Sequence, residues 1–519
     1  SHTDFEGLAV EDRGSYNWTH NKGTNYNVSL TASYNKVFNS DHLVSVFARY
    51  DIDERYTHAA GVNVKGFPND KMDEVFLGNE PTTTSGDEGT NRSIGFVSTV
   101  NYSYKQRYAV DGSIRIDGSS EFGRNNRFAP FWSVGAGWNI HNEEFATRFG
   151  WLNTFRLRYS YGVTGNVSFA PYQAVTTYFY NGENFYLHGI GAVPKTMGNR
   201  DLKWELTKAH NFGLNLDLWD NRISATFDYY VKTTDDVLID MSVPPSVGEV
   251  TVRNNLGQMR NKGFEFEVTA LLVALKDWRF SLKVNGDHNK NEILGISNSL
   301  AKYNEEANAD GSSAPKILYK EGESTTAIYA VRSAGINPAT GEEVFIKRNG
   351  AWTLEYDPND KVVVGDESAW LKGAFFPMLS YKGWQLNMAF EYNFGGQIYN
   401  TTRANNVENV NPRNNVDRRA FEERWKNVND VPAYLDIANA DSRTSYHTSR
   451  FVEDDNNVIC RSIELAYDFN QNLLKKIGFK RLRLSVGMKD PFRMSTVKFE
   501  RGTEYPFSRG FTFSISPTF

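Results

Sequence analysis

The last nine residues constrain the fold of this chain more than any other segment. Phe511, Phe513, Ile515 and Phe519 fall on alternate positions, and serine or threonine fills the positions between them. Neighbouring residues of a β-strand point to opposite faces, so this segment is a strand with one apolar and one polar face. Because the strand ends on an aromatic residue at the carboxyl terminus, it is typical of a membrane barrel whose last strand faces lipid.

The composition agrees with a membrane barrel and excludes a helical membrane protein. Aromatic residues make up 14% of the 519 residues, yet mean hydropathy is −0.54 and the longest apolar stretch covers residues 270–275. A transmembrane helix needs roughly 20 apolar residues, so the chain can cross a membrane only as a closed barrel. The net charge of −5 gives no reason to expect nucleic acid, and the single Cys460 excludes a disulfide framework.

A two-residue period recurs along the whole chain and predicts an all-β fold. Leu157 and Tyr159, for example, alternate with Arg156 and Arg158. The same pattern occupies residues 108–116, 132–140, 212–218, 223–231, 264–268, 384–394 and 482–488. A water-soluble sandwich also alternates, but here the polar faces carry charges and the apolar faces carry aromatics at their ends. Most segments are about 9–11 residues long, the length of a tilted membrane strand.

The connections between these segments alternate in length, as they do in outer-membrane barrels. Tight turns are expected at Lys382-Gly383 and Asp220-Asn221, and fairly short ones at residues 471–479 and 272–278. Long outer loops are expected at residues 52–91, 164–208, 235–260, 291–325 and 395–457. We count about seventeen or eighteen strands, including segments near Tyr16 and Val344, within one barrel domain over residues 1–519.

Several motifs along the chain form a recognisable signature. The most recognisable is Arg115-Ile-Asp-Gly-Ser-Ser-Glu-Phe-Gly123, followed by Phe131-Trp-Ser-Val-Gly-Ala-Gly-Trp138 and Glu143-Glu-Phe145. Further similar segments are residues 157–166, Leu202-Lys-Trp-Glu205, residues 207–211, 261–265, 335–341 and 511–519. Together these segments resemble the SusC-like (SusC/RagA) TonB-dependent transporters of Bacteroidetes outer membranes. The resemblance covers nearly the whole chain, with the motifs in the family's order.

The resemblance implies energy-coupled import of large nutrients, oligosaccharides or peptides, across the bacterial outer membrane. Family members have a 22-stranded barrel, an internal plug domain, TonB as the energy-transducing partner and a SusD-like surface lipoprotein as a lid. No plug sequence is visible here and about four strands are missing. The chain therefore resembles the carboxyl-terminal barrel portion, with the remainder expected as another chain or as a further upstream segment.

Two sets of residues are candidates for contacts with plug or substrate. The first set consists of charges that the alternation places in the lumen: Asp111, Arg115, Asp117, Arg156 and Arg158. These charges equally suit a simpler role, in which they solvate the interior and hold the plug by ion pairs. The second set consists of loop aromatics that suit sugar stacking, lid contact or loop packing: Tyr178, Phe179, Tyr180, Phe185 and Tyr186.

No motif indicates an enzyme, a metal site or a cofactor. The nine histidines show neither HExxH nor another paired spacing. Two alternatives to an importer remain open from the sequence, namely a plugless porin and a surface adhesin. A porin needs no plug and conducts passively, whereas an adhesin binds a partner without moving solute.

Overall fold

The computed structural model of the chain consists almost entirely of antiparallel β-structure. It describes residues 14–519 except 69–70, 72–73, 123–124, 167–175, 187–188, 197, 200–202, 243–250, 297–303, 305–312, 314–317, 411–415, 437–445, 471–473, 475–477 and 499–508. The predicted all-β fold is confirmed.

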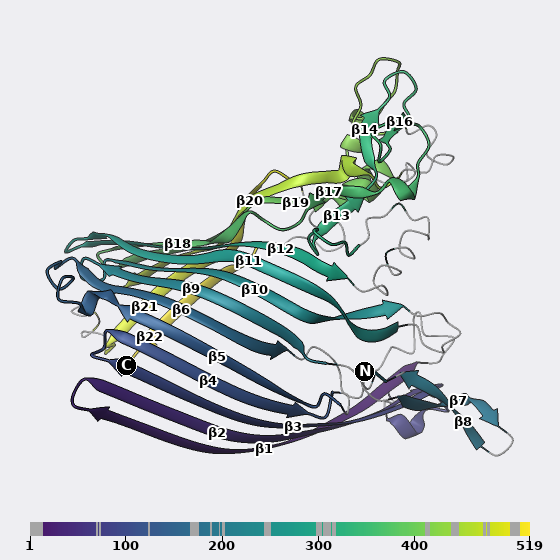
Figure 1. The fold of residues 1–519 in the computed structure, drawn as a ribbon. Coiled ribbons are helices and arrows are strands. Elements are labelled where there is room, and N and C mark those ends of the chain that lie inside the picture. Colours follow the sequence, from purple (N-terminus) through teal and green to yellow (C-terminus); the bar gives the residue numbers. More distant parts are fainter. Residues whose placement is uncertain are drawn as a thin grey trace.

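One antiparallel sheet of fifteen strands forms the body of the molecule and curves into a barrel wall (Figure 1). Its strands, in spatial order, are β1 (Ser15–Phe38), β2 (His42–Lys65), β3 (Glu80–Tyr104), β4 (Tyr108–Ser119), β5 (Phe128–Asn139), β6 (Leu152–Asn166), β9 (Glu205–Leu218), β10 (Ile223–Ser242), β11 (Thr251–Ala274), β12 (Trp278–Ile296), β18 (Leu371–Tyr381), β19 (Trp384–Tyr399), β20 (Val452–Asp468), β21 (Arg481–Ser495) and β22 (Phe511–Thr518). Each strand between β1 and β22 pairs with the preceding and the following strand of the sheet. Within the described residues, β1 and β22 are the two edges.

In the part of the chain that the structure describes, the sheet has fifteen strands, fewer than the seventeen or eighteen that we counted from the sequence. The segment near Tyr16 is indeed β1, but Val344 lies in β15 (Glu343–Ile346), outside the main sheet. This short strand pairs with β14 (Arg332–Ile336) and β16 (Trp352–Thr353) in a small separate sheet. The count was too high because a short alternating segment in a loop has the same sequence pattern as a barrel strand.

Several strands are also much longer than a membrane crossing requires. β2 has 24 residues and β3 has 25, and they pair along nearly their whole length. The expectation of loops at residues 52–91 and 235–260 is therefore wrong for much of both segments. Outside the lipid both faces of a strand are polar, as at residues 82–85, so no apolar alternation marks the extension.

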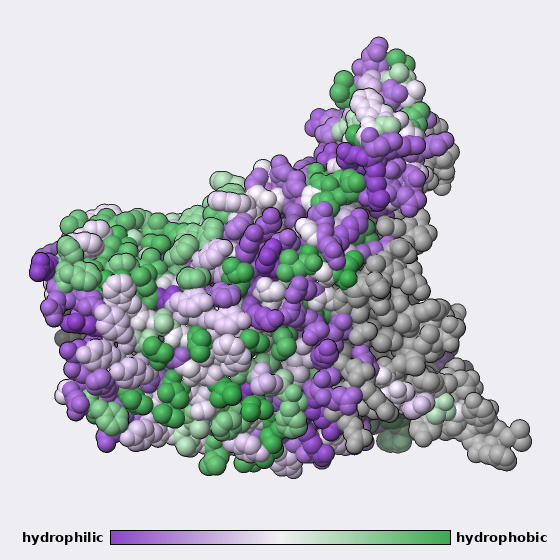
Figure 2. All heavy atoms as spheres, viewed as in Figure 1, coloured by the Kyte–Doolittle hydropathy of each residue, from purple (hydrophilic) through white to green (hydrophobic). Residues whose placement is uncertain are grey.

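The two ends of the sheet differ as predicted. Short turns such as residues 39–41, 105–107, 219–222 and 382–383 lie at one end, and the long connections lie at the other (Figure 1). Apolar residues are concentrated over the short-turn end, and hydrophilic residues dominate toward the long loops (Figure 2). Large apolar side chains on the outward face are exposed, including Val110 at 54% and Phe212 at 53%. Such a belt requires lipid or another apolar partner.

Helices contribute little to the fold. Those that lie in the described part of the chain have three to five residues: η1 (Val75–Leu77), η2 (Ile140–Asn142), η4 (Pro358–Asp360), α2 (Thr401–Arg403), η5 (Ala404–Glu408), α3 (Arg419–Glu422) and η6 (Ser449–Phe451). Among the described residues, no helix has both the length and the apolar character needed to cross a membrane.

Two long connections on the side opposite the short turns pack into a small structure of their own, which we call the outer lobe. It comprises residues 327–366, 400–410, 416–436 and 446–452, and it projects beyond the sheet (Figure 1). Its remaining strands are β13 (Ala327–Ala330) and β17 (Val362–Asp366). One apolar cluster joins Ile328 to Tyr399 and Phe451, so the two connections share a core.

A buried ionic network ties the two connections of the outer lobe together. The Arg450 guanidinium contacts Glu343 at 2.8 Å and Glu408 at 3.1 Å. The Glu408 side chain is fully buried and that of Glu343 is 3% exposed. The Arg424 guanidinium donates to the carbonyl oxygens of Ala420, Val407, Glu408 and Leu435. Because the carboxylates are buried, each depends on Arg450 to offset its lost hydration.

We expect Arg450→Ala to unfold the outer lobe while the barrel wall stays intact. The substitution leaves Glu343 and Glu408 buried without their cation, which costs about 3–5 kcal/mol. Hydrogen–deuterium exchange should rise sharply over residues 343–346 and 404–408 and stay unchanged in β4 and β5. The control is Arg418→Ala, because the Arg418–Glu422 pair is exposed and contributes little. Equal exchange in both variants would argue against the network.

The stability of the outer lobe should also fall below neutral pH. Burial lowers the pKa of His447, whose Nδ1 lies 2.9 Å from the Tyr399 hydroxyl. A histidine with a lowered folded pKa favours the neutral form, so its contribution is present above the unfolded pKa of about 6.5 and is lost as pH falls through the folded pKa. Exchange over residues 446–452 should therefore be faster at pH 5.5 than at pH 7.5. His447→Gln should remove this difference; if it persists unchanged, another group is responsible.

Candidate functional site in the barrel lumen

Four of the sequence motifs meet at the long-loop end of the sheet. Phe122 stacks on Trp204 with ring centroids 4.0 Å apart, and Phe131 meets the same indole edge-on at 5.3 Å. Phe122, Phe131 and Trp204 are all buried, and Leu206 packs against them. A Cβ added to Gly165 would overlap the Phe131 ring, so only glycine fits at that position. The motifs therefore build one aromatic cluster that locks β4, β5, β6 and β9 together.

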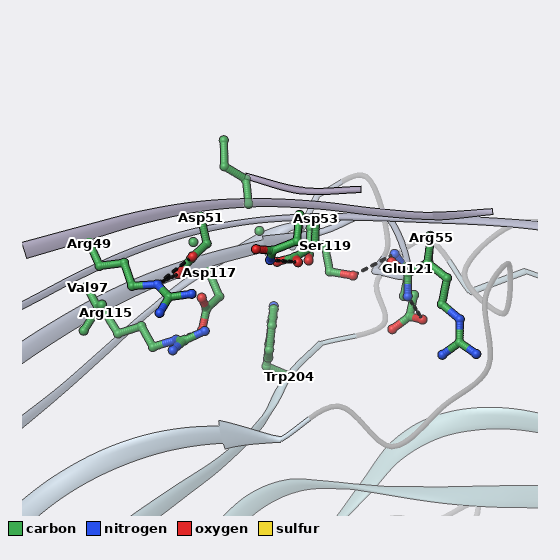
Figure 3. Close-up of a pocket in the computed structure, with 16 residues that line it drawn as sticks. Arg49, Asp51, Asp53, Arg55, Val97, Arg115, Asp117, Ser119, Glu121 and Trp204 are labelled. Carbon is green, nitrogen blue, oxygen red and sulfur yellow. Dashed lines mark hydrogen bonds and ion pairs between the residues drawn. The ribbon is translucent and has the colours of Figure 1, made fainter. Parts of the chain in front are cut away.

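A polar cavity of about 700 Å³ lies beside this cluster on the inner face of β2, β3 and β4 (Figure 3). Figure 3 shows that the side chains of Arg49, Asp51, Arg115 and Asp117 point to the same side of these strands, toward Trp204. The other polar residues that line the cavity are Asn27, Asp53, Arg55, Asn91, Ser93, Ser119 and Glu121.

Ion pairs between residues two apart give this cavity its chemistry. Arg49 Nε donates to Asp51 at 2.7 Å, and Arg115 Nε donates to Asp117 in the same way on β4. Residues i and i+2 of a strand share a face, so each pair stands on the inner surface. The guanidinium groups supply donors and the carboxylates supply acceptors, which together suit an uncharged or zwitterionic polar solute.

Amide–carboxylate hydrogen bonds extend the polar surface toward the loops. Asn27 donates to Asp53, and Asn91 donates to Glu121. Glu121 lies just beyond the end of β4, where burial raises its pKa and the hydrogen bond from Asn91 opposes that effect. The cavity wall therefore contains a carboxyl group that is harder to ionise than an ordinary glutamate.

Only some of the predicted lumen residues line the cavity. Arg115 and Asp117 lie in the cavity, whereas Asp111, Arg156 and Arg158 are not among its lining residues. Arg158 instead contacts Asp228 of β10 at 3.1 Å, reaching across β9. Arg158 is thus part of an ion pair within the barrel wall, and its contact with plug or substrate stays a prediction.

Glycines make room for these charged side chains. A Cβ at Gly213 would lie 2.6 Å from Arg158 Nη2 and 2.7 Å from an Asp228 oxygen. A Cβ at Gly135 would similarly lie 2.6 Å from the Asp111 carboxylate. The glycines on the lumen face of β5 and β9 therefore have a physical cause: long lumen side chains of the neighbouring strands lie over them.

Sequence reasoning missed Arg49, Asp51, Asp53 and Trp204 as cavity residues. A signal was present, because Arg49, Asp51 and Asp53 alternate with Tyr50 and Ile52. Placing a loop from residue 52 onward hid the continuation of this strand. Trp204 was recognised only as part of a family motif, and nothing in its local pattern indicates a cavity wall.

The predicted loop aromatics lie in a hairpin that is separate from the main sheet. It is formed by β7 (Thr177–Tyr186) and β8 (Gly189–Thr196). Tyr178 is 62% exposed. The side chains of Phe179, Tyr180, Phe185 and Tyr186 lie outside the described residues. A role for these aromatics in ligand or lid contact remains a prediction.

The comparisons with known proteins identify the family. The family model described as "TonB dependent receptor-like, beta-barrel" matches residues 2–410. The chain belongs to this family. The predicted SusC-like relationship and outer-membrane location are confirmed, and the exposed apolar belt is the lipid-facing surface of a barrel wall.

Curated relatives and solved structures agree with this assignment. The chain is 28% identical to TonB-dependent receptor P39 of Formosa agariphila, over 89% of this chain and 48% of the relative. It is 26% identical to TonB-dependent receptor SusC of Bacteroides thetaiotaomicron, over 79% of this chain and 41% of the relative. The RagAB peptide transporter structure matches with a TM-score of 0.85 and 25% identity, over 98% of this chain and 56% of that one. The chain thus spans about half the length of these relatives.

We expect Trp204→Ala to destabilise the loop end of β4, β5 and β9. Truncating a buried aromatic of this kind costs about 3–5 kcal/mol. The transition temperature of the folded barrel, followed by heat-modifiable electrophoretic mobility, should drop by several degrees. Trp352→Ala is the control, since Trp352 is 73% exposed. If the two variants have the same transition temperature, the aromatic cluster does not hold the strands together.

Proposed function

We propose that this chain forms part of the barrel of a TonB-dependent importer, over a single barrel domain spanning residues 1–519. Membership of the TonB-dependent receptor family supports this proposal, as does the outward apolar belt around a polar inner face. The remaining barrel strands and the plug would come from the part of the protein that corresponds to the other half of its relatives. Asp111, Arg156 and Arg158 then contact the plug or shape the barrel interior.

The observation that carries the proposal furthest is the polar cavity on the inner wall. It lies toward the long-loop end of the strands, where a solute entering from outside meets the barrel first. Fixed ion pairs offer hydrogen-bond donors and acceptors to that solute without adding a strong net charge. We therefore propose that Arg49, Asp51, Arg115 and Asp117 contact the imported nutrient.

The proposed cargo is an oligosaccharide or a peptide, taken up with the help of a SusD-like surface lipoprotein. The SusC relative supports such a two-component transporter, and the similar RagAB structure is named a peptide transporter. The outer lobe and the β7–β8 hairpin project from the end where a lid would close (Figure 1). TonB would act through the plug from the opposite, short-turn end.

Energy-dependent uptake is the direct test of this proposal. Cells carrying the whole protein should take up labelled oligosaccharides or peptides, and either a protonophore or loss of TonB should abolish that uptake. A surface lipoprotein should co-purify with the protein. Uptake that continues without a proton gradient would instead indicate a porin, and binding without uptake would indicate an adhesin.

Removing one ion pair from the cavity should slow import without disturbing assembly. The double substitution Arg49→Ala with Asp51→Ala removes both charges together, so neither is left unpaired. We expect the uptake rate at limiting substrate to fall about tenfold, because each hydrogen bond to a charged group is worth about 1.5–3 kcal/mol. Membrane levels of the protein should be normal.

The matched control is Arg92→Ala with Glu54→Ala. That pair joins Glu54 of the same strand, β2, to Arg92 of its neighbour β3 at a distance of 2.9 Å, but it lies on the opposite face of the sheet. Uptake by this control should equal that of the unaltered protein. An equal loss of uptake in both double variants would contradict a solute-binding role for the cavity.

A further inference from the structure

A shallow apolar trough crosses the outward face of the sheet near its short-turn end. The strand register places Val110, Ala136, Tyr159 and Phe212 in one row across β4, β5, β6 and β9. The next row toward the short turns contains Tyr108, Trp138 and Leu157. These residues line a depression of about 500 Å³.

A small residue, Ala136, forms the floor of this trough, and aromatic residues form its walls. Ala136 stands between its larger neighbours Val110 and Tyr159. Tyr159 and Phe212 contact each other on one side with ring centroids 4.7 Å apart. Tyr108 and Trp138 stack on the other side at 6.4 Å. A narrow, flexible hydrocarbon chain fits this shape better than the flat surface of another protein would.

A polar cluster closes the trough at the membrane boundary. Tyr108 Oη and Trp138 Nε1 both donate to Glu143, at 2.7 and 3.0 Å. Arg107 lies 3.3 Å from Glu143 and 3.7 Å from Glu144. Those two hydrogen bonds lower the pKa of Glu143, so it stays ionised beside Arg107. The Glu144 side chain is 91% exposed, which leaves its carboxylate open to a cation at the membrane surface.

We propose that this trough is a binding site for one phospholipid of the periplasmic leaflet. An acyl chain lies over Ala136 beside Val110, and the head group meets Arg107 and Glu144. Arg107 attracts the phosphate, and Glu144 attracts the amine of a zwitterionic ethanolamine head group. Since the cluster carries one cation and two carboxylates, it disfavours an anionic glycerol head group. The inference rests on the outer-membrane location and does not depend on transport.

Filling the trough tests this proposal. The whole protein, stripped of lipid in detergent, is titrated with phosphatidylethanolamine or phosphatidylglycerol and observed by native mass spectrometry. We expect one tightly bound phosphatidylethanolamine, with weaker phosphatidylglycerol binding. Ala136→Phe should weaken the binding of the first lipid about tenfold, equivalent to losing roughly two buried methylene contacts.

Two further variants keep the test decisive. Ala225→Phe introduces the same side chain at an outward position of β10, between Leu216 and Val268, at a similar distance from the short turns, and should leave lipid binding unchanged. Glu144→Gln, at an exposed position, should reduce the preference for phosphatidylethanolamine over phosphatidylglycerol without affecting folding. Equal binding by Ala136→Phe and the unaltered protein would overturn the proposal. So would a preference for phosphatidylglycerol, or a head-group preference that survives Glu144→Gln.

Discussion

The pairing of backbone groups between antiparallel neighbours is the constraint on which everything else in this structure depends. Lipid offers no hydrogen bonds, so every N–H and C=O at membrane depth must find a partner in the next strand. The order of the fifteen strands follows the chain because short turns can join antiparallel neighbours directly. Once that ladder is fixed, the two-residue period decides which side chains meet lipid and which face the lumen.

The sequence was sufficient to predict the parts of the fold that obey this period inside the lipid. The faces of β4, β5, β6 and β9, the tight turn at Lys382-Gly383 and the last strand were all predicted correctly. The errors lie where lipid no longer selects side chains. Beyond the membrane, β2 and β3 continue as strands with polar residues on both faces, and the outer lobe contains short strands that imitate barrel segments.

The candidate site was harder to predict because it depends on contacts between distant segments. Arg115 and Asp117 were recognisable from alternation on one strand. Their association with Arg49, Asp51 and Trp204 requires the register of β2, β3 and β4 and the packing of Trp204 on Phe122. No local sequence pattern predicts these contacts between distant segments. The family motifs nevertheless mark it indirectly, since the aromatic cluster that they build forms one side of the cavity.

Cysteine accessibility on intact cells tests the central claim, that alternate residues of one strand face lipid and lumen. Ser93→Cys places a thiol on the inner face of β3 beside the cavity, and Phe96→Cys places one on the outward face. The native Cys460 is buried and gives little background. A polar, membrane-impermeant maleimide should label Ser93→Cys and leave Phe96→Cys unlabelled. Equal labelling of the two positions would contradict a lipid-facing barrel wall with a solute-accessible lumen.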